Sequence, residues 1–284
     1  ARRGNTMRLN GIDAELLDRE QVRKMVPILD FDNARFPVMG GLLQKRGGTA
    51  RHDAVAWGYA RAASALGVDI IQNCEVRGFL RDGDAVVGVE TSRGTIRAGR
   101  VGIAAAGHSS VLAELAGFKL PVTSYALQAM VSEPVKPLLD TVVLSPGTGA
   151  YVSQSDKGEM VFGAALDLFP SYAQRGSFAL TQSIMAANLA IFPSFSRLQL
   201  LRQWAGIVDV VRDSSPIIGP TPIPGLYINC GWGTGGFKAI PAGGWTLAHV
   251  LATGKNHELA EAFQLERFHS GRLVDEAAAS GIAH

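Results

Sequence analysis

The sequence predicts a mixed fold, α+β or α/β, in which two domains are interleaved along the chain. A strand-helix-strand order extends over residues 52–107, where a helix and short apolar runs alternate. Between residues 121 and 211 the pattern changes to longer β-type runs, as in an antiparallel sheet. An apolar run at residues 226–230 is then followed by glycines and a helix. We therefore expect an α/β domain that is interrupted by an antiparallel-sheet domain.

Composition and charge restrict the classes of partner. A chain of 284 residues with 47% hydrophobic residues can bury a sizeable core. Lys and Arg number 27 against 25 Asp and Glu, without a basic block, so we expect small-molecule or protein partners and neither nucleic acid nor membrane. We expect no signal peptide, and no run reaches the roughly eighteen apolar residues that span a membrane. Cys74 and Cys230 show no metal-type spacing, which predicts reduced thiols, a cytoplasmic location and no metal site.

The first 46 residues predict one helix and one strand. Residues 16–26 are expected to form a short helix with Asp18 as its N-cap, and Pro27 ends it. Residues 36–43 are an apolar stretch typical of a strand. With no glycine-rich turn and no initial methionine, this segment is expected to be the middle of a fold.

Residues 47–63 are the stretch around which the rest is organised. Two glycines precede Arg51 and His52, and Gly58 and Ala62 give the following helix a small-residue face. The positive end of the helix dipole disfavours a second positive charge at His52, and a neutral imidazole is a nucleophile. His52 is therefore a candidate for covalent chemistry, and a solvent-facing histidine near a helix cap is the alternative. Arg51 is suited to neutralise an anion, and an exposed arginine is the alternative there.

The next fifty residues predict strands. A buried strand is expected at residues 68–74, and residues 75–98 predict an antiparallel meander with Asp-Gly and Arg-Gly turns. Residues 101–107 form a strand of small apolar residues that ends in glycine, and a helix is expected at residues 109–115. A glycine in this position lets a cofactor lie against the backbone.

A glycine-rich run follows the strand at residues 226–230. Gly231, Gly233 and Gly236 match the pattern GxGxxG, but that motif needs a second parallel strand with an acidic residue about twenty residues on. Here the pattern that follows stays helical, with helices expected over residues 241–253 and 258–272. The dinucleotide interpretation is therefore rejected.

The glycine-rich run is better explained as a loop whose bare backbone packs against a flat ligand. Lys238 would bring a positive charge to the far end of this loop, and a surface lysine is the alternative. No nucleophile elbow, metalloprotease motif or phosphate loop is present, and His108-Ser109-Ser110 is interpreted as a helix cap.

Several segments together resemble the D-amino-acid-oxidase-like flavin amine oxidases. They are the strand ending in Ala106-Gly107, the turn Trp204-Ala205-Gly206, residues 213–219 and the glycine-rich run with Phe237-Lys238. The stretch with Arg51-His52-Asp53 narrows the resemblance to the β subunit of heterotetrameric sarcosine oxidase. The similarity extends over essentially all 284 residues, and it corresponds to the C-terminal two-thirds or so of such a subunit.

The resemblance implies two flavins. His52 matches the histidine that is joined covalently to the 8α-methyl carbon of FMN. Lys238 matches the lysine beside the isoalloxazine ring of a noncovalent FAD, near the substrate carboxylate, and is the implied catalytic residue. The other implied cofactor-binding residues are Arg51, Val76, Ala106, Gly107, Gly233, Gly235 and Gly236. Trp204 and Trp232 are assigned no role.

The implied activity is oxidative demethylation of sarcosine at FAD, with electron transfer to FMN and then to oxygen, giving glycine, a formaldehyde equivalent and hydrogen peroxide. A dimethylglycine-type flavin dehydrogenase that passes electrons to a carrier protein is one alternative. A noncatalytic scaffold chain without flavin is another.

The resemblance also implies partners and domain boundaries. The family begins with a strand, a GxGxxG turn and a helix that hold the FAD pyrophosphate, and this chain has no such start. Either this chain is a piece of a longer subunit, or the N-terminal part is supplied as a separate chain and is then a partner; further subunits of α, γ and δ type are also expected. Residues 47–107 and 209–284 are expected to form the FAD-binding domain, and residues 1–46 and 108–208 the substrate domain.

Overall fold

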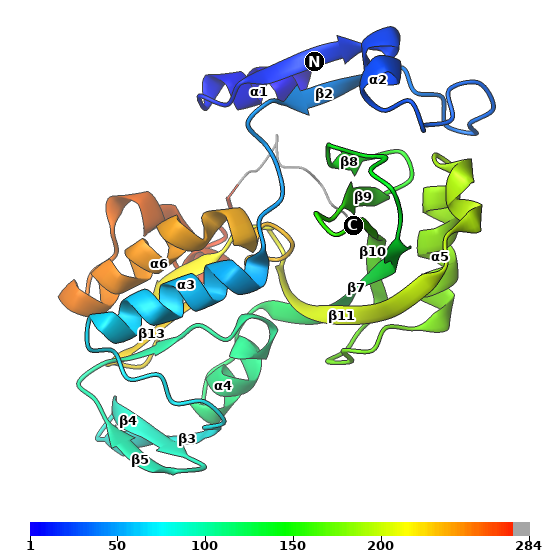
Figure 1. Ribbon diagram of the computed structural model, residues 1–284. Coiled ribbons are helices and arrows are strands. Elements are labelled where there is room, and N and C mark those ends of the chain that lie inside the picture. Colours follow the sequence, from blue (N-terminus) through cyan, green and yellow to red (C-terminus); the bar gives the residue numbers. More distant parts are fainter. Residues whose placement is uncertain (275–284) are drawn as a thin grey trace.

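A computed structural model describes residues 1–274, apart from the side chains of residues 164 and 165 (Figure 1). Its first unit consists of two helices and a two-stranded antiparallel sheet, namely α1 (Arg2–Leu9), β1 (Ala14–Asp18), α2 (Arg19–Met25) and β2 (Gly40–Gln44). Asp18 accepts a hydrogen bond from the Gln21 backbone, and the Gln21 side chain accepts one from the Asp18 backbone. Asp18 is therefore the predicted N-cap of α2.

The predicted helix over residues 16–26 is wrong in its first part. Leu16 and Leu17 belong to β1, where Leu16 pairs with Leu42 and Leu17 with Gly41. Pairing with β2 satisfies the backbone hydrogen-bonding groups of this segment, so it forms a strand where the sequence pattern alone predicts a helix. The strand expected at residues 36–43 is confirmed only in its second half, because β2 begins at Gly40 and residues 36–39 are not in a strand.

The expected antiparallel sheet has five strands in the order β11-β7-β10-β9-β8. They are β7 (Val122–Pro134), β8 (Val143–Leu144), β9 (Tyr151–Gln154), β10 (Glu159–Pro170) and β11 (Leu200–Val211). The longest register joins β11 to β7, from Val211 opposite Val122 to Leu200 opposite Ser132, with a bulge near Arg202. The helices α5 (Phe178–Leu189) and η2 (Pro193–Arg197) follow β10 in the chain.

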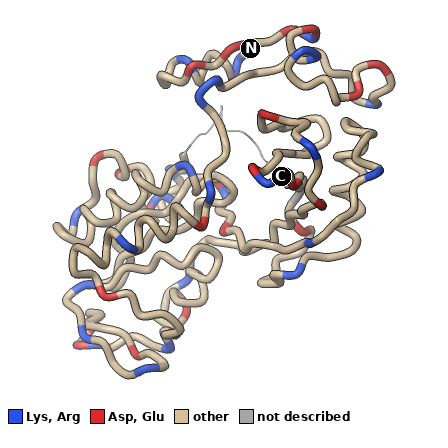
Figure 2. The backbone as a smooth tube through the Cα atoms, viewed as in Figure 1, with Lys and Arg blue, Asp and Glu red and all other residues tan. Residues whose placement is uncertain are grey.

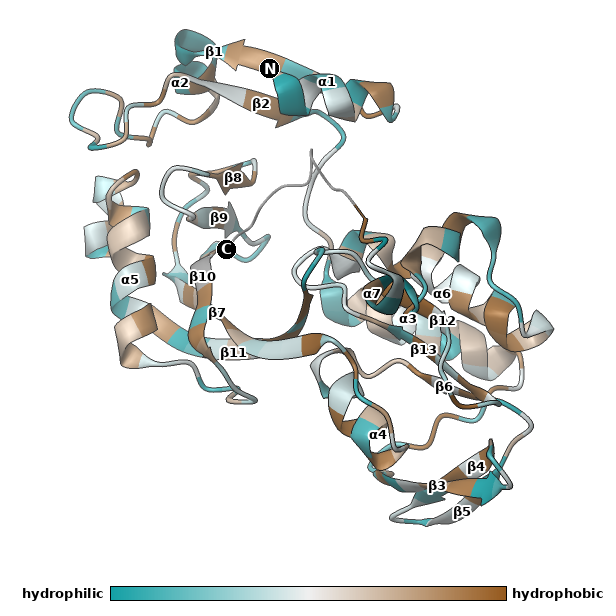
Figure 3. Cartoon of the chain, turned by 180° about the vertical axis from the view of Figure 1, so that it is seen from behind, coloured by the Kyte–Doolittle hydropathy of each residue, from teal (hydrophilic) through white to brown (hydrophobic). Residues whose placement is uncertain are grey.

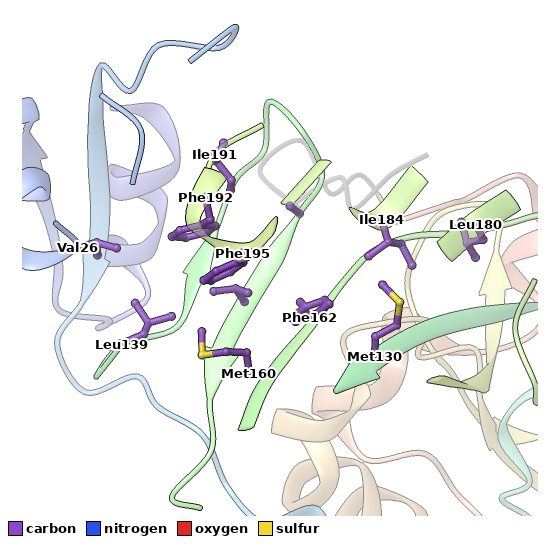
Figure 4. Close-up of a cluster of buried hydrophobic side chains, with 12 residues drawn as sticks. Val26, Met130, Leu139, Met160, Phe162, Leu180, Ile184, Ile191, Phe192 and Phe195 are labelled. Carbon is purple, nitrogen blue, oxygen red and sulfur yellow. The ribbon is translucent and has the colours of Figure 1, made fainter. Parts of the chain in front are cut away.

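One hydrophobic core lies against this sheet, and we name it the sheet core (Figure 4). The rings of Phe192 and Phe195 stack with their centroids 4.7 Å apart, and Phe162 stacks on Phe195 at 6.3 Å. Val26, from the end of α2, joins this core and so fixes the first unit to the sheet. The buried members are Val26, Met130, Leu139, Ala150, Val152, Met160, Phe162, Leu180, Ile184, Ile191, Phe192 and Phe195.

The α/β part contains a three-stranded sheet in the order β12-β13-β6. Its elements are β6 (Val101–Ile103), β12 (Ile217–Pro220), β13 (Leu226–Cys230) and α6 (Gly236–Thr253). β13 runs parallel to β6 and antiparallel to β12. A second cluster of buried apolar side chains packs here and includes Ile103, Val211, Ile217 and Ile228. In the described residues after α6 there are helices and no strand, which confirms that the GxGxxG match is not a dinucleotide fingerprint.

The remaining elements surround this sheet. They are α3 (His52–Ala65), β3 (Val76–Asp82), β4 (Ala85–Thr91), β5 (Gly94–Arg97), η1 (Ala106–His108), α4 (Ser109–Leu115), η3 (Glu258–Phe263) and α7 (Arg267–Ser270). The predicted meander is confirmed as β3-β4-β5 and lies at the end of the molecule away from the first unit (Figures 1 and 3). The domain boundaries expected from the resemblance stay a prediction.

Three other expected elements differ from the structure. Residues 68–74 form no strand, and Val68 and Ile70 are about half exposed, because no strand in the described part of the chain pairs with them. The strand expected over residues 101–107 ends at Ile103. The last expected helix, residues 258–272, is two short helices, η3 and α7.

Charged residues are distributed over the backbone with both signs interspersed (Figure 2). Within residues 1–274, no helix combines the length and the apolar character that a bilayer span requires.

A buried ion pair attaches α7 to the loop after β11. The Arg267 Nε lies 2.7 Å from Asp213 Oδ2, and the two side chains are 4% and 2% exposed. Arg267 also donates to the backbone oxygens of Ser215 and Phe263. Burial acts to raise the pKa of Asp213, but the Arg267 guanidinium and the Val274 N–H outweigh burial and lower it.

We expect Asp213→Asn to destabilise the chain by about 3–5 kcal/mol, because it leaves a buried arginine without its counter-charge. The pair contributes stability above pH 3.8, the ordinary value for Asp, and loses it as the pH falls through the lowered native value. Urea unfolding at several pH values measures the difference. Asp156→Asn, at an exposed turn position, should unfold like the unaltered chain. An Asp213→Asn variant with unchanged stability at neutral pH would contradict the expectation.

Candidate functional site

The candidate site is built on the loop that connects β13 to α6. Gly231 and Gly233 adopt φ angles of +77° and +53°, a region that side-chain-bearing residues disfavour. Gly235 is the N-cap residue of α6, and Gly236 is the first residue of that helix. The sequence uses glycine at 231 and 233 because the loop turns through left-handed backbone conformations.

A buried carboxylate on β11 holds this loop. Asp209 is 3% exposed, and its Oδ2 accepts from the N–H of Gly231 at 2.5 Å while Oδ1 accepts from the N–H of Gly233 at 3.1 Å. Burial raises the pKa of Asp209, and the backbone N–H groups of Gly231, Gly233 and Trp232 act against that rise. Asp209 is not among the site residues predicted from the sequence. Its signal is one acidic residue inside the otherwise apolar β-run of residues 205–211.

A tryptophan fixes the same loop against α6. The Trp232 Nε1 donates to Asn229 Oδ1 at 2.6 Å, and the Asn229 amide donates to the backbone oxygen of Gly243 at 2.9 Å. A Cβ atom at Gly243 would lie 2.8 Å from the indole ring. Asn229 and Trp232 therefore align the loop with the helix, and Asn229 is likewise not among the predicted site residues.

Lys238 lies in the first turn of α6 and is exposed. Its Nζ donates to the backbone oxygen of Gly235 at 3.3 Å, so the cation sits beside the glycine loop. An exposed ammonium in this position is available to an anionic ligand.

The turn at Ala106 and Gly107 also packs against β11. A Cβ at Gly107 would lie 2.3 Å from Ile207 Cγ2, so packing alone requires glycine here, and its carbonyl accepts from Ser124 Oγ at 2.6 Å. Ala106 has a φ of +45°, which is uncommon for a residue with a Cβ, and backbone strain of this kind clusters at functional sites. The turn and the glycine loop thus both contact the same strand, β11.

Cys230 lies at the end of β13 beside Asp209. Burial, together with the Asp209 carboxylate, raises the pKa of this thiol to about 12. Cys230 is therefore a neutral buried side chain with no nucleophilic role at neutral pH.

The remaining predicted site residues are not joined to this loop by hydrogen bonds among residues 1–274. His52 is the first residue of α3 and is exposed. Arg51 is exposed and contacts Asp53 at 3.5 Å. Val76 is the first residue of β3. Over the same residues, no cluster of three or more His, Cys, Asp or Glu side chains is arranged to hold a metal ion.

Comparison with known proteins identifies the class. A family model described as FAD dependent oxidoreductase matches residues 1–250. The chain belongs to this family of FAD-dependent oxidoreductases.

Within the family, the chain is a homologue of sarcosine oxidase subunit beta. It is 58% identical over 275 residues to that protein of Rhizobium meliloti (strain 1021), and 55% identical over 284 residues to that of Arthrobacter sp.. The alignments cover 97% and 100% of this chain but 66% and 70% of those proteins, so the chain spans about two-thirds of their length.

Two solved structures share the fold. L-Proline dehydrogenase from P. horikoshii has a TM-score of 0.88 and 27% identity, with 95% of this chain and 72% of that chain covered. Glycine oxidase from Geobacillus kaustophilus has a TM-score of 0.81 and 22% identity, with 94% and 70% covered.

The loop fits a flat cofactor such as the flavin of FAD. A Cβ at Gly206 on β11 would have no atom within 4 Å, and one at Gly233 would have its nearest neighbour 3.9 Å away. At Gly235 the nearest atoms would lie 3.6 Å away, one of them Lys238 Nζ. Gly206 thus presents bare backbone to open space, whereas an added Cβ at Gly233 or Gly235 would make only ordinary contacts, and Lys238 places a cation at one end of the loop.

We expect Gly231→Ala to destabilise the chain by about 1–2 kcal/mol, because alanine is disfavoured at positive φ and Val211 lies 3.1 Å from the new Cβ. Gly244→Ala is the matched control. Gly244 lies inside α6 with no atom within 4 Å of an added Cβ, so alanine there should stabilise by roughly 0.5–1 kcal/mol. Thermal or urea unfolding measures both changes, and changes of the same sign would contradict this account.

Proposed function

We propose that this chain is the larger part of a sarcosine oxidase β subunit. The reaction would convert sarcosine, water and oxygen into glycine, formaldehyde and hydrogen peroxide. The observation that carries the proposal is the glycine loop, with Lys238 at its end. Identity of 55–58% to sarcosine oxidase β subunits supports the choice of substrate class.

The chain's own residues bind and orient. FAD would supply the acceptor for the hydride equivalent of the sarcosine methyl group, and FMN the second redox centre on the way to oxygen. Backbone at Gly233, Gly235 and Gly236, with the turn at Ala106 and Gly107, would lie along the FAD. The Lys238 ammonium would pair with the sarcosine carboxylate and would stabilise negative charge that develops on the ring.

His52 and Arg51 would serve the FMN. An exposed imidazole at the start of α3 is accessible for a bond to the 8α-methyl carbon of FMN, and Arg51 would neutralise part of the charge of that flavin. Val76, at the start of β3, would contact the adenine part of FAD through its backbone.

Exposed apolar surface supports the proposal of partner polypeptides. Within the described residues α3 has no buried side chain, and Trp57 is 57% exposed. Leu66 is 87% exposed, and Val68 and Ile70 after it are 53% and 49% exposed. An α/β domain buries such a helix face and such a strand-like run. We propose that the N-terminal part of the β subunit covers this surface and that further subunits complete the assembly.

The compartment and the alternatives remain part of the proposal. Both cysteines are free, which supports a reducing, cytoplasmic environment. A dimethylglycine-type dehydrogenase would use the same fold with a carrier protein as acceptor. Oxygen consumption with peroxide formation separates an oxidase from that dehydrogenase, and a colourless purified protein would favour a scaffold chain.

Lys238→Met should raise the KM for sarcosine and slow flavin reduction by about 10–100-fold, because it removes a charge that pairs with the substrate carboxylate. Rapid-mixing absorbance of the flavin under anaerobic conditions measures the reduction. Lys157→Met, at an exposed turn position, is the control and should leave both quantities unchanged. Unaltered reductive kinetics in Lys238→Met would remove this residue from the site.

His52→Ala should release the covalent flavin. In the unaltered protein a flavin should stay with the polypeptide through acid precipitation, whereas in the variant all flavin should appear in the supernatant. Absorbance of pellet and supernatant at the flavin bands measures the partition. His108→Ala is the control, since that exposed ring lies against the Tyr172 ring in a tilted arrangement and its loss should leave the partition unchanged. Full release of flavin from the unaltered protein would sink the assignment.

A further inference from the structure

We infer that Asp209 is a positioning residue that couples the five-stranded sheet to the flavin-facing loop. The inference rests on the proposed function in one respect, namely that a flavin lies against the glycine loop. It goes further by assigning the shape of that loop to one carboxylate on β11.

Asp209 keeps its place opposite Ser124 in the β11–β7 pairing, and its side chain accepts hydrogen bonds from the loop. Its two carboxylate oxygens accept from the N–H groups of Gly231 and Gly233, and its backbone oxygen accepts from the Gly233 N–H at 3.0 Å. Among residues 1–274 it forms no ion pair, so the groups that lower its pKa against the effect of burial are backbone N–H groups. Hydrogen bonds to an ionised acceptor are about twice as strong as neutral ones. Burying a carboxylate without a counter-ion is energetically unfavourable. Here the hydrogen bonds that compensate this cost are the ones that fix the geometry of one loop.

The strand that carries Asp209 also forms the edge of the sheet. Four residues before Asp209, the backbone N–H of Ala205 donates to the backbone oxygen of Gln174, in the connection between β10 and α5. Between them lies Gly206, whose backbone faces open space. A shift of β11 relative to this connection would therefore move Asp209, and with it the N–H groups at the start of the loop. Lys238 follows through its bond to the Gly235 oxygen.

A purely structural role for Asp209 predicts a different result from a positioning role. If Asp209 served stability alone, any core substitution of equal cost would have the same effect on the flavin. If Asp209 sets the loop, the flavin spectrum and the exchange of the two glycine amides change together, and changes elsewhere in the core leave both alone.

Asp209→Asn tests this in the assembled flavoprotein. The amide keeps the size of the side chain but turns one acceptor into a donor that faces a backbone N–H. We expect hydrogen exchange of the Gly231 and Gly233 amides to speed up at least tenfold, the absorbance bands of the bound flavin to shift, and the FAD dissociation constant to rise by roughly 5–50-fold. Ile184→Val, in the sheet core, is the stability control and should change neither the bands nor these amides under native conditions.

Each outcome decides between the alternatives. Unchanged exchange at both glycines would overturn the role of Asp209 in the loop. Faster exchange with an unshifted flavin would overturn the coupling to the cofactor, and an equal shift in Ile184→Val would assign the effect to stability. If the protein holds no flavin, the proposed function fails, while exchange at Gly231 and Gly233 still reports on the carboxylate.

Discussion

The pairing of β7 with β11 is the interaction on which both parts of the chain depend. β7 lies between β11 and β10, and β11 leaves the sheet through Val211, which is buried in the second hydrophobic cluster. Along the same strand, Ile207 packs against the turn at Gly107, and Asp209 accepts hydrogen bonds from the glycine loop. One strand is therefore the edge of a sheet and a wall of the candidate site. A fold of this kind cannot rearrange the sheet without moving the site.

Local signals in the sequence predicted local structure well. Asp18 was identified as a helix cap because a cap needs an acceptor and a following turn, both within four residues. The meander β3-β4-β5 follows from its glycine turns, and α3 begins at His52 where the small-residue pattern starts. The rejection of the GxGxxG match also succeeded, because the motif depends on a neighbouring element that the pattern after Gly254 did not provide.

Long-range contacts explain what could not be predicted. An apolar run such as residues 68–74 indicates that burying its side chains is favourable, but it does not indicate which other surface covers them. The bond from Asp209 to Gly231 joins residues far apart in sequence, so neither composition nor spacing indicates it. The final segment is broken into η3 and α7, which lets Arg267 reach Asp213, a contact that no helical periodicity encodes. In each case the missing information is a tertiary partner.

The exposed position of α3 affects how firmly its first residue is held. A helix of 14 residues is only marginally stable in water when its faces are not packed, even with as many alanines as this one has. His52 is the first residue of that helix, and helix ends fray first. The backbone that carries its ring is therefore the least firmly held part of α3. A group bonded to the ring would gain a defined orientation only when another surface packs on α3. Under the proposed function, attachment at His52 and covering of α3 would therefore be two steps of one ordering process, and the second would make the first geometrically specific.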